Sequence, residues 1–251
     1  MSIPLESPEA GSNPDLRVAI TGGTSGLGLA LVREWRARGA RVAFVARNRG
    51  RVERTAAQEG AFGIVGDVSQ KDEIYPIATQ MLGSLGGLDV LVNNASSLGP
   101  TPLALLGDTD CEDFAEAIAT NLLGPFRLTK ALLGALAASA REGRGSVVLN
   151  ISSDAAVTPY PRWGAYGASK AALLHMSRIW HAELMPDGIR VLALDPGDMD
   201  TPLHALAVPD SDPAELLRPE VAAARLADAI AAELAAKRSA SAPLAPQGSE
   251  A

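Results

Sequence analysis

Residues 21–28 read Thr-Gly-Gly-Thr-Ser-Gly-Leu-Gly, and the pattern on either side of this stretch decides the fold. The apolar run 17–21 before it predicts a β-strand, and the periodic apolar pattern 27–38 after it predicts a helix. Glycines between a strand and a helix let backbone N–H groups approach a pyrophosphate, and the helix N-terminus adds partial positive charge. The alternative is a glycine turn that only caps the helix. Its place at the start of a βαβ run favours the phosphate-binding interpretation.

Short apolar runs alternate with longer helical patterns along the rest of the chain. Further strands are predicted at 41–46, 64–66, 90–93, 146–151 and 190–194, and helices at 111–121 continuing through 126–141 and at 166–184. Continuous apolar strands are typical of a parallel sheet that is covered on both faces. The predicted fold class is α/β: a single-domain, Rossmann-like, doubly wound parallel sheet with helices on both faces. We expect this domain to span 16–238, between flexible segments at 1–15 and 239–251 that are rich in Pro, Ser, Gly and Ala.

The composition excludes several classes of protein. The 251 residues carry a net charge of −7 without a basic stripe, so a nucleic-acid partner is not expected. Cys111 is the only cysteine, no Cys/His cluster has metal-ligand spacing, and no stretch approaches about 18 uninterrupted apolar residues. We therefore expect no metal site and no membrane span, and a cytoplasmic location.

The end of the second predicted strand indicates which dinucleotide binds. An acidic residue there would bond the 2′-hydroxyl of the adenosine ribose, but the sequence is Ala46-Arg47-Asn48. Arg47 can form a charge-assisted fork with a 2′-phosphate, so NADP(H) is favoured over NAD(H), although a solvated surface arginine is the alternative. Asp67 and Val68 follow the third strand, and Asn94 and Ala95 the fourth. Each pair is either a cofactor edge or a simple turn.

The strongest local chemistry is in Tyr166-Gly167-Ala168-Ser169-Lys170. A Tyr and a Lys four residues apart near a helix start lie on one face, so the ammonium can stabilise a phenolate and lower the pKa of the Tyr. Ser153 ends the fifth strand thirteen residues earlier, where a hydroxyl can bond a substrate oxygen. Ser152 competes for that role, and a helix-surface pair and a capping serine are the structural alternatives.

Together these motifs resemble the short-chain dehydrogenase/reductase family, specifically its compact single-domain branch, over roughly 18–233. The likeness adds Asn121 in Thr-Asn-Leu and Pro196-Gly197 followed by Thr201. It implies a catalytic tetrad of Asn121, Ser153, Tyr166 and Lys170, in which Tyr166 is the general acid or base, Lys170 also holds the nicotinamide ribose and Asn121 supports a proton-relay water. Motifs and resemblance together assign the cofactor to Gly22, Thr24, Ser25, Gly26, Leu27, Gly28, Arg47, Asn48, Asp67, Val68, Asn94, Ala95, Tyr166, Lys170, Pro196, Gly197, Met199 and Thr201.

Three departures from the family pattern matter. Ser96 stands where a glycine is commoner, Asp154 follows Ser153, and Ser25 replaces a basic residue of many NADP-dependent members, so the NADP(H) preference depends on Arg47. The substrate rim is expected at 96–105, 154–165 and the lid 202–219. Its candidate substrate residues are Ser96, Asp154, Trp163 and His204. Trp163, like nearby Tyr160, suggests an aromatic or polar substrate, but packing or surface roles are equally compatible.

The predicted function is an NADP(H)-dependent oxidoreductase that transfers a hydride between the nicotinamide and a carbonyl/secondary alcohol pair of a small organic substrate. Alternatives are an epimerase or dehydratase that recycles its nucleotide internally, and a dinucleotide-sensing protein that is not an enzyme. The helices at 111–141 and 166–184 have wide apolar faces, which the family uses for oligomers, so a homodimer or homotetramer is expected.

Overall fold

The computed structural model describes residues 15–240, which form one sheet of six parallel strands in the order β3-β2-β1-β4-β5-β6. The strands are β1 (Arg17–Thr21), β2 (Arg41–Ala46), β3 (Phe62–Val65), β4 (Val90–Asn93), β5 (Ser146–Ile151) and β6 (Ile189–Leu194). The chain runs outward from β1 to β3 and then returns to place β4 beside β1. This reversal opens a crevice at the carboxyl ends of β1 and β4. The predicted fold class is confirmed.

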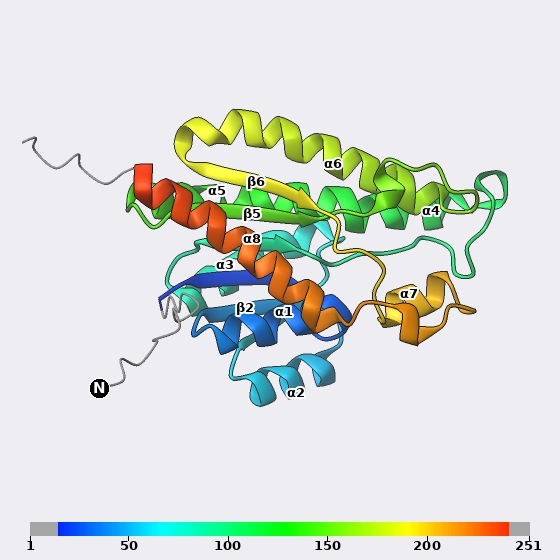
Figure 1. Cartoon of the computed structure of the whole chain (residues 1–251), viewed down its shortest axis with the longest axis horizontal. Helices are drawn as coiled ribbons and strands as arrows, with labels where there is room; N and C mark the ends of the chain where they lie inside the picture. The colour runs from blue at the N-terminus through cyan, green and yellow to red at the C-terminus, as the bar shows by residue number, and fades with distance from the viewer. Residues whose placement is uncertain (1–14, 241–251) are drawn as a thin grey trace, which may run out of the picture.

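Helices cover both faces of the sheet (Figure 1). One face carries α1 (Gly26–Ala37), α2 (Arg49–Glu59) and α8 (Pro219–Ala240), and the other carries α3 (Ile74–Leu85), α5 (Gly124–Arg141) and α6 (Gly164–Leu184). A π-helical turn (Ala119–Leu123) joins α4 (Cys111–Ile118) to α5, and α7 (Pro202–Ala207) lies at the carboxyl-end side of the sheet. Short 3-10 turns occur at Lys71–Glu73, Leu106–Asp108, Asp154–Ala156, Met185–Asp187 and Pro213–Glu215.

Two hydrophobic cores lie on the two faces of the sheet because successive side chains of a strand point in opposite directions. In β1, Val18 and Ile20 pack with α1 and α8, whereas Ala19 packs on the opposite face. In β4, Val92 and Leu91 divide in the same way. All five side chains are fully buried, and burial of each large aliphatic group contributes roughly 2 kcal/mol.

The sequence predicted the bounds of β1, β2, β4 and β5, while β3 begins earlier, at Phe62, and β6 begins at Ile189. It did not locate α2, α3, α7 or α8. Only Val52 and Thr55 of α2 are buried, so its apolar pattern is weak, and α3 contains Pro76 in its first turn, where proline is tolerated. The segments 1–14 and 241–251, predicted to be flexible, lie outside the described residues, and α8 includes 239 and 240.

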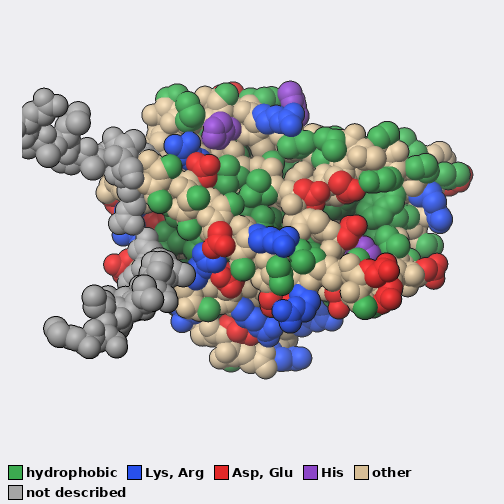
Figure 2. All heavy atoms as spheres, viewed as in Figure 1, with side chains coloured by type: hydrophobic (Ala, Val, Ile, Leu, Met, Phe, Trp, Pro, Cys, Tyr) green, Lys and Arg blue, Asp and Glu red, His purple; other side chains and the backbone are tan. Residues whose placement is uncertain are grey.

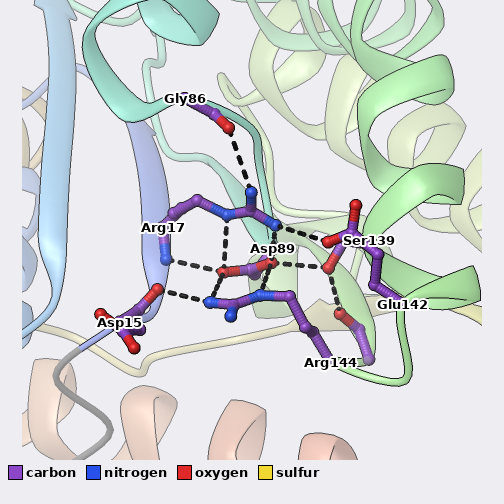
Figure 3. Close-up of polar contacts among 8 residues, drawn as sticks. Asp15, Arg17, Gly86, Asp89, Ser139, Glu142 and Arg144 are labelled. Carbon is purple, nitrogen blue, oxygen red and sulfur yellow. Dashed lines mark hydrogen bonds and ion pairs between the residues drawn. The ribbon is translucent and has the colours of Figure 1, made fainter.

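Asp89 forms a buried ion-pair cluster at the amino ends of the strands, on the edge of the sheet away from the crevice (Figure 3). Its carboxylate lies between two guanidinium groups, 2.6 Å from Arg17 Nη2 and 3.1 Å from Arg144 Nη2, and it accepts a 2.6 Å hydrogen bond from the Ser139 hydroxyl. Burial raises the pKa of Asp89, but the bonds from Arg17, Arg144 and Ser139 outweigh it and bring the pKa down to about 2. The cluster ties β1, β4, α5 and the segment before β5 together.

Candidate active site

A cavity of about 1050 Å³ opens at the carboxyl ends of the strands, in the crevice between β1 and β4. All eighteen residues that the sequence assigned to the cofactor line this cavity, as do Ser153 and the four candidate substrate residues. Asn121 is fully buried behind the lining instead. The topology therefore brings together side chains that are as far as 180 residues apart along the chain.

The β1–α1 loop has the shape of a phosphate cradle. Gly22 has a φ of +74°, and a Cβ on Gly28 would lie 2.1 Å from the carbonyl oxygen of Gly22, so the loop requires glycine at both positions. The Ser25 side chain makes no capping hydrogen bond to α1, which leaves the first N–H groups of the helix facing the cavity. A pyrophosphate fits this arrangement of backbone donors.

Asn94 holds this loop in place, which is a role that the sequence did not assign to it. Its side-chain amide donates a 2.9 Å hydrogen bond to the carbonyl oxygen of Thr21. In return, the Thr21 hydroxyl accepts from the backbone N–H groups of Asn94 and Ala95, at 3.0 and 2.9 Å. The tips of β1 and β4 are therefore fastened together where the crevice begins.

Two exposed arginines stand at the adenosine end of the cavity, Arg47 at the end of β2 and Arg51 in the first turn of α2. The Asn48 side chain caps α2 by accepting from the Arg51 N–H at 2.9 Å. Arg51 was not predicted from the sequence, because its relation to Arg47 depends on where α2 begins. Asp67, which also lines the cavity, accepts from the Ser69 N–H at 2.9 Å.

Ser153, Tyr166 and Lys170 meet in the middle of the cavity. Tyr166 is 8% exposed on α6, and the hydroxyl groups of Ser153 and Ser96 act on its phenol, lowering its pKa against the effect of burial. Lys170 Nζ lies 5.4 Å from the centre of the Tyr166 ring and donates a 2.8 Å bond to the carbonyl oxygen of Ile151. Both Ser152 and Ser153 line the cavity, and it is the Ser153 hydroxyl that acts on the pKa of the phenol.

Burial dominates the electrostatics of these two groups. It raises the pKa of Tyr166 to about 12, with added contributions from the carboxylates of Asp195 and Asp154, against the lowering effect of the Ser153 and Ser96 hydroxyls. It also lowers the pKa of Lys170 to about 8, against the opposing effect of Asp195. From the sequence, the lysine was expected to lower the pKa of the tyrosine. That direction was wrong for this structure, because the cost of burying a phenolate is larger.

Asn121 lies in the π-helical turn between α4 and α5, and its side chain is fully used in holding loops. Its Oδ1 accepts from the Ser96 hydroxyl at 3.1 Å and from the Ser97 N–H at 2.8 Å. Its Nδ2 donates to the Ser97 carbonyl oxygen at 2.7 Å and to the Ser169 hydroxyl at 2.8 Å. The side chain thus joins the segment after β4 to the catalytic face of α6. π-Helical turns of this kind occur frequently at functional sites.

The remaining wall of the cavity combines aromatic and acidic groups. Trp163 packs edge-on to Tyr166 with ring centres 5.6 Å apart, and Tyr160 packs against Trp163. Asp154 and Asp195 place carboxylates on the same side of the cavity. Asp195 was missed in the sequence, although it directly follows β6 and precedes Pro196.

The lid over this wall has a tied stem. Met199 forms a parallel β-bridge with Leu217, the Asp200 N–H donates to the Leu217 carbonyl oxygen, and the Leu217 N–H donates to the Asp198 carbonyl oxygen, both at 3.0 Å. Between these stems lies α7, which Thr201 caps by accepting from the His204 N–H at 3.2 Å. Figure 2 shows hydrophobic side chains around this end of the molecule with acidic side chains among them.

Comparisons with known proteins agree with this geometry. A family model described as short chain dehydrogenase matches residues 17–212. The chain is 34% identical over 199 residues to an L-fucose dehydrogenase of Mus musculus, covering 78% of this chain and 70% of that protein.

Two solved structures illustrate the similarity in three dimensions. A 3-ketoacyl-(acyl-carrier-protein) reductase from Brucella melitensis complexed with NADH superposes with a TM-score of 0.77 at 27% identity, covering 84% of this chain and 88% of the other. An actinorhodin polyketide ketoreductase with NADPH superposes with a TM-score of 0.79 at 27% identity, covering 90% and 94%.

Fold, cavity and similarities together define a nicotinamide-dependent oxidoreductase that interconverts alcohols and carbonyl compounds. The chain belongs to the short-chain dehydrogenase family, as the resemblance in its sequence predicted. Within residues 15–240, no group of three or more His, Cys, Asp or Glu side chains could hold a metal ion, and no helix is long and apolar enough to cross a membrane.

Proposed function

We propose that this protein is an NADP(H)-dependent ketone reductase or alcohol dehydrogenase that acts on a small organic carbonyl/secondary alcohol pair, with Tyr166 as its general acid and base. The observation that carries the proposal is the meeting of Ser153, Tyr166 and Lys170 in the cavity that begins at the glycine loop. The bound nicotinamide would supply or accept the hydride at the carbonyl carbon.

The residues of the chain handle the proton. A pKa of about 12 keeps the Tyr166 phenol protonated at neutral pH, so it is ready to donate to a carbonyl oxygen that gains negative charge. The Ser153 hydroxyl bonds the same oxygen and stabilises that charge. Lys170, with a pKa of about 8, is mainly an ammonium group at neutral pH, and it favours the phenolate that remains after proton donation. Asn121 is a positioning residue, since it contacts loops rather than the cavity.

Two arginines support the preference for NADP(H). Arg47 and Arg51 both line the adenosine end of the cavity, where a 2′-phosphate would accept charge-assisted hydrogen bonds from them. Asp67, a carboxylate that also lines the cavity, accepts from the backbone N–H of Ser69 in its own turn. The two solved relatives described above hold NADPH in one case and NADH in the other, so the preference rests on these arginines.

The test is absorbance of the reduced nicotinamide with purified protein, NADPH or NADH, and a panel of ketones, aldehydes and quinones. Tyr166→Phe should lower kcat at least 10³-fold with NADPH binding retained, because only the proton donor is lost. Tyr75→Phe is the matched control, since Tyr75 is 71% exposed on α3 and should leave kcat unchanged. Tight NADPH binding with no turnover of any carbonyl would instead favour a dinucleotide sensor or an enzyme with internal hydride recycling.

We further propose a homodimer or homotetramer, a single domain over 16–238 and a cytoplasmic location. The oligomer is supported by the resemblance to a family that uses the helices at 111–141 and 166–184 for such contacts, and Ile179 on α6 is 45% exposed. The one cysteine, Cys111, is exposed and free, which suits a reducing compartment. Light scattering after size exclusion would measure the oligomer, and a monomer at micromolar concentration would contradict it.

A further inference from the structure

Asp154 holds the hydroxyl that the proposed reaction needs. The Ser153 hydroxyl donates a 3.0 Å hydrogen bond to Asp154 Oδ1, and the Ala155 N–H donates to the same oxygen at 2.7 Å. The other carboxylate oxygen, Oδ2, accepts from the Tyr160 hydroxyl at 2.7 Å. All these groups line the cavity. The bond from Tyr160, followed by that from Ser153, keeps the pKa of Asp154 below its ordinary value.

A hydroxyl group has one proton, and this sets a condition on the substrate. When the Ser153 hydroxyl donates its proton to a substrate carbonyl oxygen, its hydrogen bond to Asp154 is broken, and the charged Oδ1 of Asp154 loses one of its donors. A substrate that carries its own donor on the neighbouring carbon restores that bond. Its two polar atoms then match the pair formed by Ser153 Oγ and Asp154 Oδ1, which are 3.0 Å apart.

The charges around this pair act in the same direction. Asp195 and Asp198 add two more carboxylates to the cavity wall, whereas the ammonium group beside the phenol is that of the buried Lys170. A substrate with a carboxylate next to its carbonyl would place like charges in contact with Asp154, which costs binding free energy. A hydroxyl or ammonium in the same place would gain a charge-assisted hydrogen bond.

We propose that the substrate is a carbonyl compound with a hydrogen-bond donor, a hydroxyl or ammonium group, on the carbon next to the carbonyl, and that Asp154 selects it by accepting that bond. In the reverse direction, the substrates are vicinal diols and amino alcohols. This inference rests on the proposed carbonyl reductase function and narrows it to a substrate class. Hydride goes to the carbonyl carbon, the proton of Tyr166 goes to the carbonyl oxygen, and the donor group is unchanged.

Four phenyl ketones test the proposal: 2-hydroxyacetophenone and 2-aminoacetophenone, with the hydroxyl or amino group on the carbon next to the carbonyl and not on the ring, propiophenone, and benzoylformate. With saturating NADPH, we expect kcat/KM for the hydroxy and amino ketones to exceed that for propiophenone by about tenfold or more, with benzoylformate the slowest. An α-hydroxyl also activates a carbonyl chemically, so the deciding quantity is how the ratios change on mutation. In Asp154→Asn, the ratio of 2-hydroxyacetophenone to propiophenone should fall about tenfold, and benzoylformate should gain.

Asp210→Asn is the matched control, because Asp210 is exposed and lies outside the cavity lining, and because this substitution removes the same charge. Its four kcat/KM values should equal those of the wild type. An unchanged ratio in Asp154→Asn, or an equal loss on all four ketones, would overturn the substrate assignment while ketone reduction stands. Turnover of none of the four by the wild type, in a panel where other carbonyls also fail, would overturn the proposed function itself. Circular dichroism and the NADPH Kd establish that the variant is folded.

Discussion

Replacement of Asp89 by Asn should destabilise the protein without changing its chemistry. The carboxylate receives bonds from two guanidinium groups and from the Ser139 hydroxyl, and none of its surface is exposed to water. An Asn at this position keeps the size of the side chain but removes its charge, and its NH2 group would face the N–H donors of the two guanidinium groups. The difference between the ordinary pKa of 3.8 and about 2 corresponds to about 2 kcal/mol of unfolding free energy at neutral pH.

Loss of the buried charge should therefore lower the unfolding free energy by about 2–4 kcal/mol, because guanidinium groups left without a counter-charge add to the loss calculated from the pKa. Urea unfolding followed by circular dichroism, at one fixed protein concentration, measures it at pH 7. Glu142→Gln is the control: this carboxylate is 57% exposed and 3.8 Å from Arg17 Nη2, so it should cost less than about 0.5 kcal/mol.

The pH dependence supplies the refutation. Because folding lowers the pKa of Asp89, its stabilisation is present above the unfolded pKa of 3.8 and is lost as the pH falls through about 2. The gap between wild type and Asp89→Asn should thus shrink by about half near pH 3. A gap that stays constant from pH 7 to pH 3, or one no larger than that of Glu142→Gln, would show that the carboxylate charge is not what stabilises this end of the sheet. The kcat of the folded variant should be unchanged, because the cluster and the cavity lie at opposite ends of the strands.

Three further outcomes follow from the cavity and its loop. Gly28→Ala should abolish cofactor binding or folding, because the new Cβ would lie 2.1 Å from a backbone oxygen. Gly83→Ala, inside α3, is the control: its Cβ meets no atom within 4 Å, so the unfolding free energy should rise by about 0.5–1 kcal/mol. Thermal melts with and without NADPH measure both effects. The kcat/KM for reduction should be flat at neutral pH and fall as pH rises through about 8, where Lys170 loses its proton, and a profile flat to pH 10 would contradict that role. Arg47→Ala and Arg51→Ala should each weaken NADPH binding by roughly tenfold or more with NADH binding unaltered, measured by titration calorimetry; equal losses for both nucleotides would exclude contact with a 2′-phosphate.

The sequence predicted the sheet because its strands are short, continuous apolar runs, and their bounds follow directly from where those runs stop. It failed at α2 because a helix with few buried side chains, such as the one that includes Val52, has little apolar periodicity to detect. In α3 the buried side chains from Ile74 to Leu85 do recur at helical spacing, so that helix was missed although its pattern was present. The bounds of β6 were off by one residue, at Ile189, next to a glycine turn. Edges of elements depend on capping contacts that come from elsewhere in the fold.

The positions of the site motifs could be predicted from the sequence, whereas the hydrogen-bond partners and pKa values of their side chains could not. The sequence predicted that Asn94 lines the cavity, but only the structure shows that its side-chain amide donates a hydrogen bond to the Thr21 carbonyl oxygen. The pKa of Tyr166 was misjudged because the number of atoms packed around a phenol cannot be read from its neighbours in the chain. Arg51 was missed for a similar reason, since its relation to Arg47 depends on where α2 begins.

The tied stem of the lid makes residues 202–216 an exchangeable segment. Because Met199 and Leu217 are bridged, the two ends of this segment are held at a fixed spacing whatever lies between them. A longer or shorter insert changes only a closed loop, whose cost in chain entropy grows slowly with its length. The registers of β6 and α8 should therefore tolerate grafted lids from relatives of different substrate preference, which would make specificity in this protein a property that can be transplanted separately from its cofactor chemistry.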